Sequence, residues 1–135
     1  MKKLVFVFAI MISGLLTAVQ AQGTSDFFNK ADTFFKTYVK DGRVSYKDIK
    51  ANPAALDELL QLAKGITVSE NDAANYQAFW INSYNLLVIK GIVDSYPVKS
   101  PLDIGGFFDK KKYDIGGTST TLNDLENKLL RAKFP

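Results

Sequence analysis

Three asparagines, Asn75, Asn82 and Asn85, are the side chains in this sequence whose spacing points to a shared polar site. At about 100° per residue, helix positions seven and ten residues apart fall on one side. Asn82 also lies between Phe79 and Leu86, inside an otherwise apolar stripe. A buried amide without hydrogen-bond partners costs about 1–3 kcal/mol, so a polar partner is expected. Two alternatives remain open: the amides tie down the backbone of a neighbouring loop, or they line a cleft and orient a catalytic group.

The composition excludes many classes of catalytic chemistry. The 135 residues contain no His and no Cys, which excludes Ser or Cys hydrolysis through histidine, His/Cys zinc sites and disulfides. No phosphate-binding loop, dinucleotide fingerprint or calcium loop occurs either, so no cofactor and no metal are expected. Carboxylate-pair chemistry stays open as a minor alternative, but no spacing singles out two of the carboxylates Asp72, Asp94, Asp103, Asp114 and Glu126.

One long helix must position the asparagines. Ser69 is a typical N-cap residue, acidic residues follow it, and Pro97 stands just past the end. The pattern predicts a helix over about 70–95, the longest element of the chain. Apolar residues cover so much of its surface that it is expected to be buried.

Shorter helices should surround it. Residues 27–38 are strongly amphipathic, with Thr24 or Ser25 as the expected cap and Gly42 as the expected end, and should dock against the long helix. Asn52 and Pro53 predict a helix from Pro53 to Lys64.

The last part of the chain is richer in turns. A final helix is expected from Thr121 to Arg131, with Glu126 opposite its leucines. Lys110–Ile115 and Thr118–Thr121 predict a hairpin, and Lys110–Lys112 would guard its edge strand. The predicted fold class is therefore α+β, mainly α, with about four helices around one long buried helix and a small β-hairpin near 110–121.

The first 21 residues look like a targeting segment. Lys2 and Lys3 precede an apolar run, Leu4–Leu16, which is followed by Val19-Gln20-Ala21. This run is shorter than the roughly 20 residues that span a bilayer. It predicts a signal peptide with cleavage after Ala21, an exported periplasmic or secreted protein, and no integral membrane segment in the mature chain; an uncleaved anchor is the alternative.

The net charge of the chain does not support nucleic acid as a binding partner. The formal net charge of +3 includes Lys2 and Lys3, and without them it falls to about +1. Nucleic-acid binding needs many clustered basic groups. The expected partner is therefore an unknown protein or small molecule.

The run FWINSYN, residues 79–85, resembles the signature of the DUF547 family, a domain of unknown function. Gly42–Tyr46, the segment around Ile115–Gly117, and Leu122–Glu126 with Leu130-Arg131 are similar to further pieces of the family pattern, in the same order. The resemblance covers about residues 27–135 and places the asparagines and Glu126 among the family's residues. Asn75, Asn82, Asn85 and Glu126 are thus the candidate cleft-lining residues.

The resemblance also implies that something is missing. Family members typically continue beyond the position of Pro135 into a segment with a histidine and a cysteine, which have no counterpart here. The first hypothesis is that residues 22–135 are a DUF547-like domain that is incomplete at its C-terminus and catalytically inactive. The alternative is a complete small interaction or ligand-binding module that uses the face of Asn75, Asn82 and Asn85.

Overall fold

The computed structural model describes the backbone of residues 2–135 and the side chains of residues 18–135. Over this range the chain forms five α-helices, a 3-10 helix, a π-helix and two antiparallel two-stranded sheets. The mainly helical α+β class is confirmed. The side chains of Lys2, Lys3 and Leu4–Leu16, on which the signal-peptide prediction depends, lie outside the described residues.

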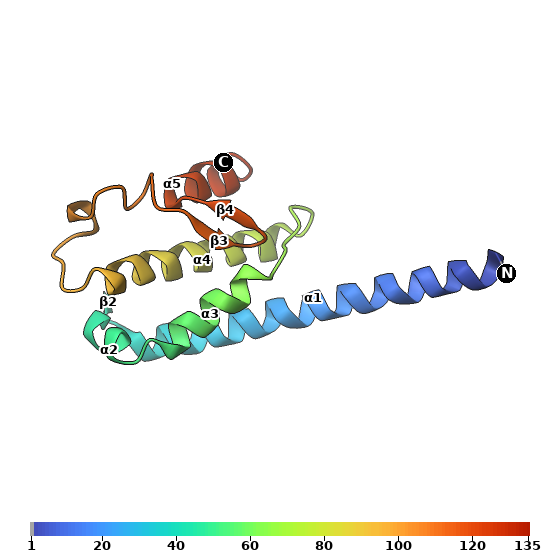
Figure 1. Cartoon of the computed structure of the whole chain (residues 1–135), viewed down its shortest axis with the longest axis horizontal. Coiled ribbons are helices and arrows are strands. Elements are labelled where there is room, and N and C mark those ends of the chain that lie inside the picture. Colours follow the sequence, from blue (N-terminus) through green and yellow to red (C-terminus); the bar gives the residue numbers. More distant parts are fainter. Residues whose placement is uncertain (1) are drawn as a thin grey trace.

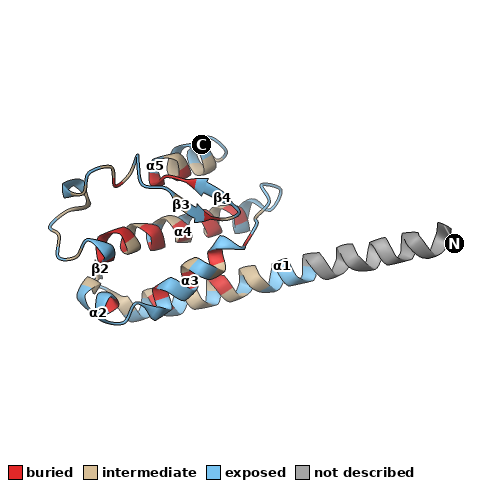
Figure 2. Ribbon diagram, in the orientation of Figure 1, coloured by how far each residue is buried: buried red, intermediate tan, exposed pale blue. Residues whose placement is uncertain are grey.

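Helix α4 (Ala73–Asp94) lies at the centre of the fold and carries much of the core (Figures 1 and 2). It begins later than predicted because the carboxylate of Asp72, not the hydroxyl of Ser69, caps it: Oδ1 of Asp72 accepts from the backbone N–H of Asn75 at 3.3 Å. Ser69 instead accepts from the N–H of Asn71 in the preceding turn. The buried residues of α4 are Tyr76, Phe79, Trp80, Ser83, Leu86, Leu87, Ile89, Gly91, Ile92 and Val93.

Helix α1 (Lys2–Tyr38) is longer than α4, so the prediction that the central helix is the longest element was wrong. The sequence from the apolar run into the amphipathic stretch contains no proline, and the helix continues through Gly23. Thr24 and Ser25 therefore lie inside α1 and do not cap it. The hydroxyl of Thr24 donates back to the carbonyl oxygen of Gln20 at 2.9 Å.

The amphipathic half of α1 packs chiefly against α3 (Ala54–Lys64), not against α4 as predicted. Phe27, Ala31 and Phe34 are buried in this contact region. An ion pair between Lys30 and Glu58 joins the two helices at the surface. Phe27 nevertheless reaches α4, because its ring centroid lies 5.2 Å from that of Phe79. Several buried aromatic side chains, each contributing about 1.5–3 kcal/mol, thus fix α1 on the domain.

A first hairpin follows α1 and was not predicted. Strands β1 (Val39–Lys40) and β2 (Arg43–Val44) pair antiparallel around Asp41 and Gly42, whose φ angles are 52° and 72°. Gly42 therefore belongs to a tight turn, where its positive φ is allowed, and does not end the helix. The short helix α2 (Tyr46–Ala51) comes next and was also missed.

The second hairpin lies close to where it was predicted. Strands β3 (Tyr113–Ile115) and β4 (Thr118–Thr120) pair around Gly116 and Gly117. The turn is attached to the end of α3, because the N–H of Gly116 donates to the carbonyl oxygen of Ala63 at 3.0 Å. Lys110–Lys112 precede β3 and are not part of it, so the expected edge-strand lysines were misplaced.

The remaining elements are α3, the 3-10 helix after α4 and the two helical segments at the end of the chain. Helix α3 ends at Lys64 as predicted, with Gly65 as its C-cap, but it begins at Ala54, because Pro53 is its N-cap and Asn52 ends α2. The 3-10 helix η1 (Pro101–Asp103) interrupts the loop after α4. Thr121 caps α5 (Leu122–Asp124) as predicted, its Oγ1 accepting from the N–H of Asp124 at 3.1 Å. The chain then changes register into the π-helix η2 (Leu125–Arg131), which the sequence pattern did not indicate.

Candidate functional site

The four predicted site residues do not line a single cleft. Asn75 is exposed near the start of α4, and Asn82 is half-buried about two turns later. Asn85 is exposed and shares a cleft with Glu126, which lies forty-one positions further along the chain. The structure therefore brings two of the four together and places the other two elsewhere. A functional role for any of them stays a prediction.

A small cleft lies between α4 and η2. Its volume is about 250 Å³, and its lining residues are Ile81, Tyr84, Asn85, Glu126 and Leu130. An amide, a phenol and a carboxylate meet here beside two aliphatic side chains. Ile81 keeps 49% of its surface exposed, which is high for a large aliphatic residue on a central helix. The cleft thus offers both hydrogen-bonding groups and apolar surface to a ligand.

The π-helix supplies one wall of this cleft. Its wider turn is visible in the bond from the N–H of Ala132 to the carbonyl oxygen of Asn127, which are five positions apart and 3.1 Å from each other. Glu126 and Arg131 have the same separation in sequence, and Nη2 of Arg131 lies 2.7 Å from Oε1 of Glu126. The π register places this pair on one side of the helix. Such segments are rare and frequently occur at functional sites.

Glu126 does not lie opposite the leucines of the last helix, as the sequence analysis expected. It lines the same cleft as Leu130. The reason is its spacing: Glu126 stands four residues after Leu122 and four before Leu130, and side chains four apart share a helix face. The prediction therefore assigned Glu126 to the wrong face of the helix, and the π-helix is not the cause of that error.

Tyr84 was missed in the sequence analysis as a site residue. Burial, and secondarily the negative charge of Glu126, raise the pKa of its phenol. The phenol therefore stays protonated at neutral pH and acts as a hydrogen-bond donor beside a carboxylate. Its position next to Asn85, within the run FWINSYN, was the available signal.

Asn82 finds its partner within its own helix. Its Nδ2 donates to the carbonyl oxygen of Ala78 at 2.8 Å. A buried amide was expected to need a partner from another element, but an amide on a helix reaches the preceding turn. The amide therefore ties down neither a neighbouring loop nor, through this bond, a catalytic group.

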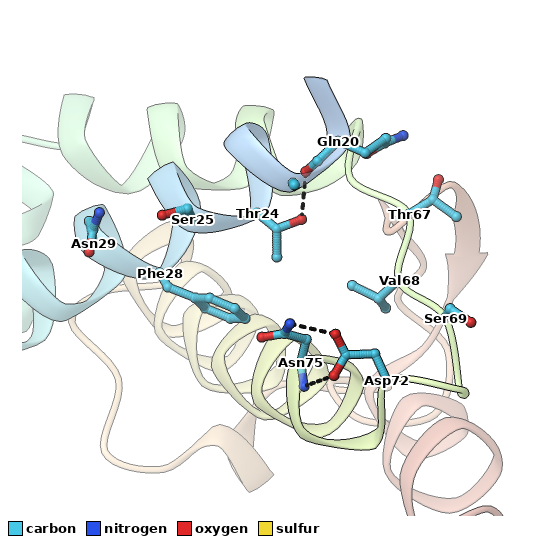
Figure 3. Close-up of a pocket in the computed structure, with 11 residues that line it drawn as sticks. Gln20, Thr24, Ser25, Phe28, Asn29, Thr67, Val68, Ser69, Asp72 and Asn75 are labelled. Carbon is cyan, nitrogen blue, oxygen red and sulfur yellow. Dashed lines mark hydrogen bonds between the residues drawn. The ribbon is translucent and has the colours of Figure 1, made fainter. Parts of the chain in front are cut away.

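Asn75 lines a different and larger pocket, of about 510 Å³, between α1, the loop at 67–69 and the start of α4 (Figure 3). Its amide Nδ2 donates to Oδ2 of Asp72 at 2.6 Å. Gln20 and Ala21, next to the predicted cleavage site, also line this pocket.

Within the described residues, no group of three or more Asp or Glu side chains is arranged to hold a metal ion. In the same part of the chain, no helix combines the length and the apolar character needed to cross a membrane.

The fold and cleft define a small, mainly helical α+β domain with a polar site between its central helix and its C-terminal π-helix. The model of the family described as "Protein of unknown function, DUF547" matches residues 68–135, half of the chain. The chain belongs to this family. The match includes FWINSYN and both later pieces of the resemblance, whereas Gly42–Tyr46 precedes the matched residues. No curated protein and no solved structure matches the chain.

Proposed function

We propose that this DUF547 protein is exported and works as a binding module without catalysing a reaction. Its cleft between α4 and η2 holds one apolar side chain and the adjoining peptide group of a protein partner. The observation that carries the proposal is the meeting of Tyr84, Asn85 and Glu126, from two segments far apart in sequence, around one cleft inside the family-matched region.

The chemistry of the lining residues suits a peptide. The Asn85 amide offers both a donor and an acceptor, which matches a peptide group, and the Tyr84 phenol offers a further donor. Ile81 and Leu130 supply apolar surface for a side chain. A volume of about 250 Å³ is below the roughly 300–1,000 Å³ of typical small-molecule sites. It therefore suits one residue of a longer partner.

The same residues are poorly placed for chemistry. A phenol whose pKa is raised is a weak nucleophile at neutral pH, because it remains protonated. The Glu126 carboxylate is paired with Arg131 at 2.7 Å. The sequence supplies no His or Cys to act as base or nucleophile. These features support binding without turnover.

Export rests on the sequence pattern of residues 1–21 and is tested by the intact mass of the protein from the producing cells. We expect a mass that corresponds to a chain beginning at Gln22, with or without loss of ammonia from a cyclised N-terminal Gln22. A mass that retains residues 1–21 would contradict cleavage after Ala21.

Binding is tested with a defined probe, the blocked amino acid N-acetyl-leucine methylamide, by amide chemical shifts in nuclear magnetic resonance. Shifts are expected at residues 81–85 and 126–131 of the wild type and should be lost in Asn85→Ala. The matched control is Asn75→Ala, an exposed asparagine of the same helix, which should leave the response unchanged. Absence of shifts in the wild type, or an unchanged response in Asn85→Ala, would overturn the proposal.

A further inference from the structure

The larger pocket at the start of α4 is separate from the cleft proposed above and shares no lining residue with it. Its volume of about 510 Å³ falls within the range of roughly 300–1,000 Å³ that is usual for small-ligand sites. Three segments from different parts of the chain form its walls, namely α1, the loop at 67–69 and the first turn of α4 (Figure 3).

The polar groups of the pocket are held in place before any ligand arrives. Oδ2 of Asp72 accepts from Nδ2 of Asn75 at 2.6 Å, and Oδ1 accepts from the Asn75 backbone N–H at 3.3 Å. This arrangement fixes the amide and leaves its carbonyl oxygen and second N–H free for a ligand. The carboxylate oxygens retain further lone pairs as acceptors. A carboxylate and an amide side by side thus form a fixed pair of acceptors and donors.

The pocket also offers apolar surface near these polar groups. The side chains of Phe28, Val68 and Thr24 lie around the same space as Asn75 (Figure 3). Phe28 is half-buried, so part of its ring is available to a ligand. Apolar surface beside hydrogen-bonding groups fits a ligand that has both C–H surfaces and hydroxyl groups.

Charge narrows the ligand class further. The ionisable side chain among the lining residues is the carboxylate of Asp72, and within the described part of the chain no cationic side chain lines the pocket to balance an anion. A phosphate or carboxylate ligand would be repelled. Neutral hydroxyl groups can instead donate to the carboxylate and accept from the amide.

We propose that this pocket binds a neutral sugar unit, with adjacent hydroxyls on Asp72 and Asn75 and the C–H surface of the ring against Phe28. The proposal does not depend on the peptide cleft. The three residues that carry it follow Ala21, and nine of the eleven lining residues do so as well. Cleavage at the predicted site would therefore keep the sugar-binding groups and open one wall of the pocket.

The test is a titration of the protein, in the form that its mass in the cells establishes, with glucose, mannose and N-acetylglucosamine. Amide chemical shifts locate any response. Changes are expected at residues 24–29 and 67–75 for at least one sugar, and Asn75→Ala should weaken that binding by about tenfold, because the hydrogen bonds from the amide to the sugar are lost. Phe28→Leu, which keeps an apolar side chain but removes the ring, should also weaken it.

Asn85→Ala serves as the matched control, because it removes an exposed amide from the same helix outside this pocket. It should leave sugar binding intact while abolishing the response to the blocked leucine, so the two proposals fail independently. Asn75 is exposed and alanine favours helices, so Asn75→Ala is expected to fold. No response to any of the three sugars, or a response that Asn75→Ala leaves unchanged, would overturn the assignment.

Discussion

Two faces of α4 differ sharply although they belong to one helix. The first face carries Trp80, Ser83 and Gly91 and is buried beneath the second hairpin and the loop before it. The second carries Ile81, Tyr84 and Asn85 and is open at the peptide cleft. Packing on the first face leaves little free space, whereas the second retains unused polar groups. Substitutions on the first face should therefore change stability, and those on the second should change binding.

The largest expected effect is that of Gly116→Ala, in the turn that covers Trp80. A methyl group at Gly116 would lie 2.4 Å from Cη2 of Trp80, and the φ angle of +62° is itself unfavourable for alanine. Strain and overpacking together should lower the free energy of unfolding by about 2–5 kcal/mol, measured by denaturant unfolding. Gly117→Ala is the matched control, since its φ of +73° is similar but its methyl would meet only Thr67 at 3.7 Å. Equal losses in both variants would show that the Trp80 contact contributes little.

Gly91→Ala should have the next largest effect. A methyl group here would lie 2.6 Å from Cε2 of Phe107 and 3.2 Å from the hydroxyl of Tyr113. Overpacking of about 1–3 kcal/mol should exceed the gain of about 1 kcal/mol that alanine brings to a helix. Thermal unfolding should show a net loss, and Phe107→Leu in the same chain should recover part of it. A loss that the second substitution does not reduce would argue against a direct contact with the ring.

Ser83→Ala should stabilise the protein. The Ser83 side chain is fully buried, and its hydroxyl has no hydrogen-bond partner among the residues that the structure describes. An unpaired buried hydroxyl costs about 1–3 kcal/mol, so its removal should raise the free energy of unfolding by about 1 kcal/mol. A decrease in denaturant unfolding experiments would mean that the hydroxyl has a partner, such as a bound water. Ser95→Ala, at the exposed end of the same helix, is the control.

The stability of the protein should decline at alkaline pH because of Tyr113, which lies against the buried face of α4. Burial, and secondarily the charge of Asp94, raise the pKa of Tyr113 to about 12. The folded state then holds this proton more tightly than the unfolded state, whose phenol titrates near pH 10. Its contribution is complete below about pH 10 and is lost as the pH rises towards about 12. Tyr113→Phe should flatten this alkaline decline in thermal unfolding, and an unchanged profile would assign the decline to other groups.

The smallest effect on stability is expected on the open face. The side chain of Asn85 is exposed and makes no hydrogen bond within the described chain, so Asn85→Ala should change the free energy of unfolding by less than about 0.5 kcal/mol. Its loss of response to the blocked leucine would then be a binding effect. A clear destabilisation would instead make the amide structural and remove the distinction between the two faces.

Elements whose start, end or turn is marked by nearby residues were predicted well. The end of α3 at Lys64 and Gly65, the Thr121 cap and the turn at Gly116-Gly117 were all recognised from nearby residues. A boundary was predicted wrongly where two local signals competed. Ser69 and Asp72 are both good caps, and only the folded chain shows that Asp72 is used.

The candidate site was partly predictable. Asn85 and Glu126 were both named, but nothing in their separation along the chain indicated that they meet. Asn75 was grouped with Asn85 because they share a side of the helix, yet different elements lie next to the two residues: α1 and the loop at 67–69 beside Asn75, and η2 beside Asn85.

The sequence by itself determined the buried central helix, the mainly α fold class, the turn of the second hairpin and the absence of His and Cys chemistry, because composition and short-range periodicity decide these. Tertiary structure alone decided which side chains share a cleft, that α1 packs chiefly on α3, and that the last helix has a π register. These features depend on contacts between residues that are far apart in the chain. The free energies of such contacts cannot be inferred from a local sequence pattern.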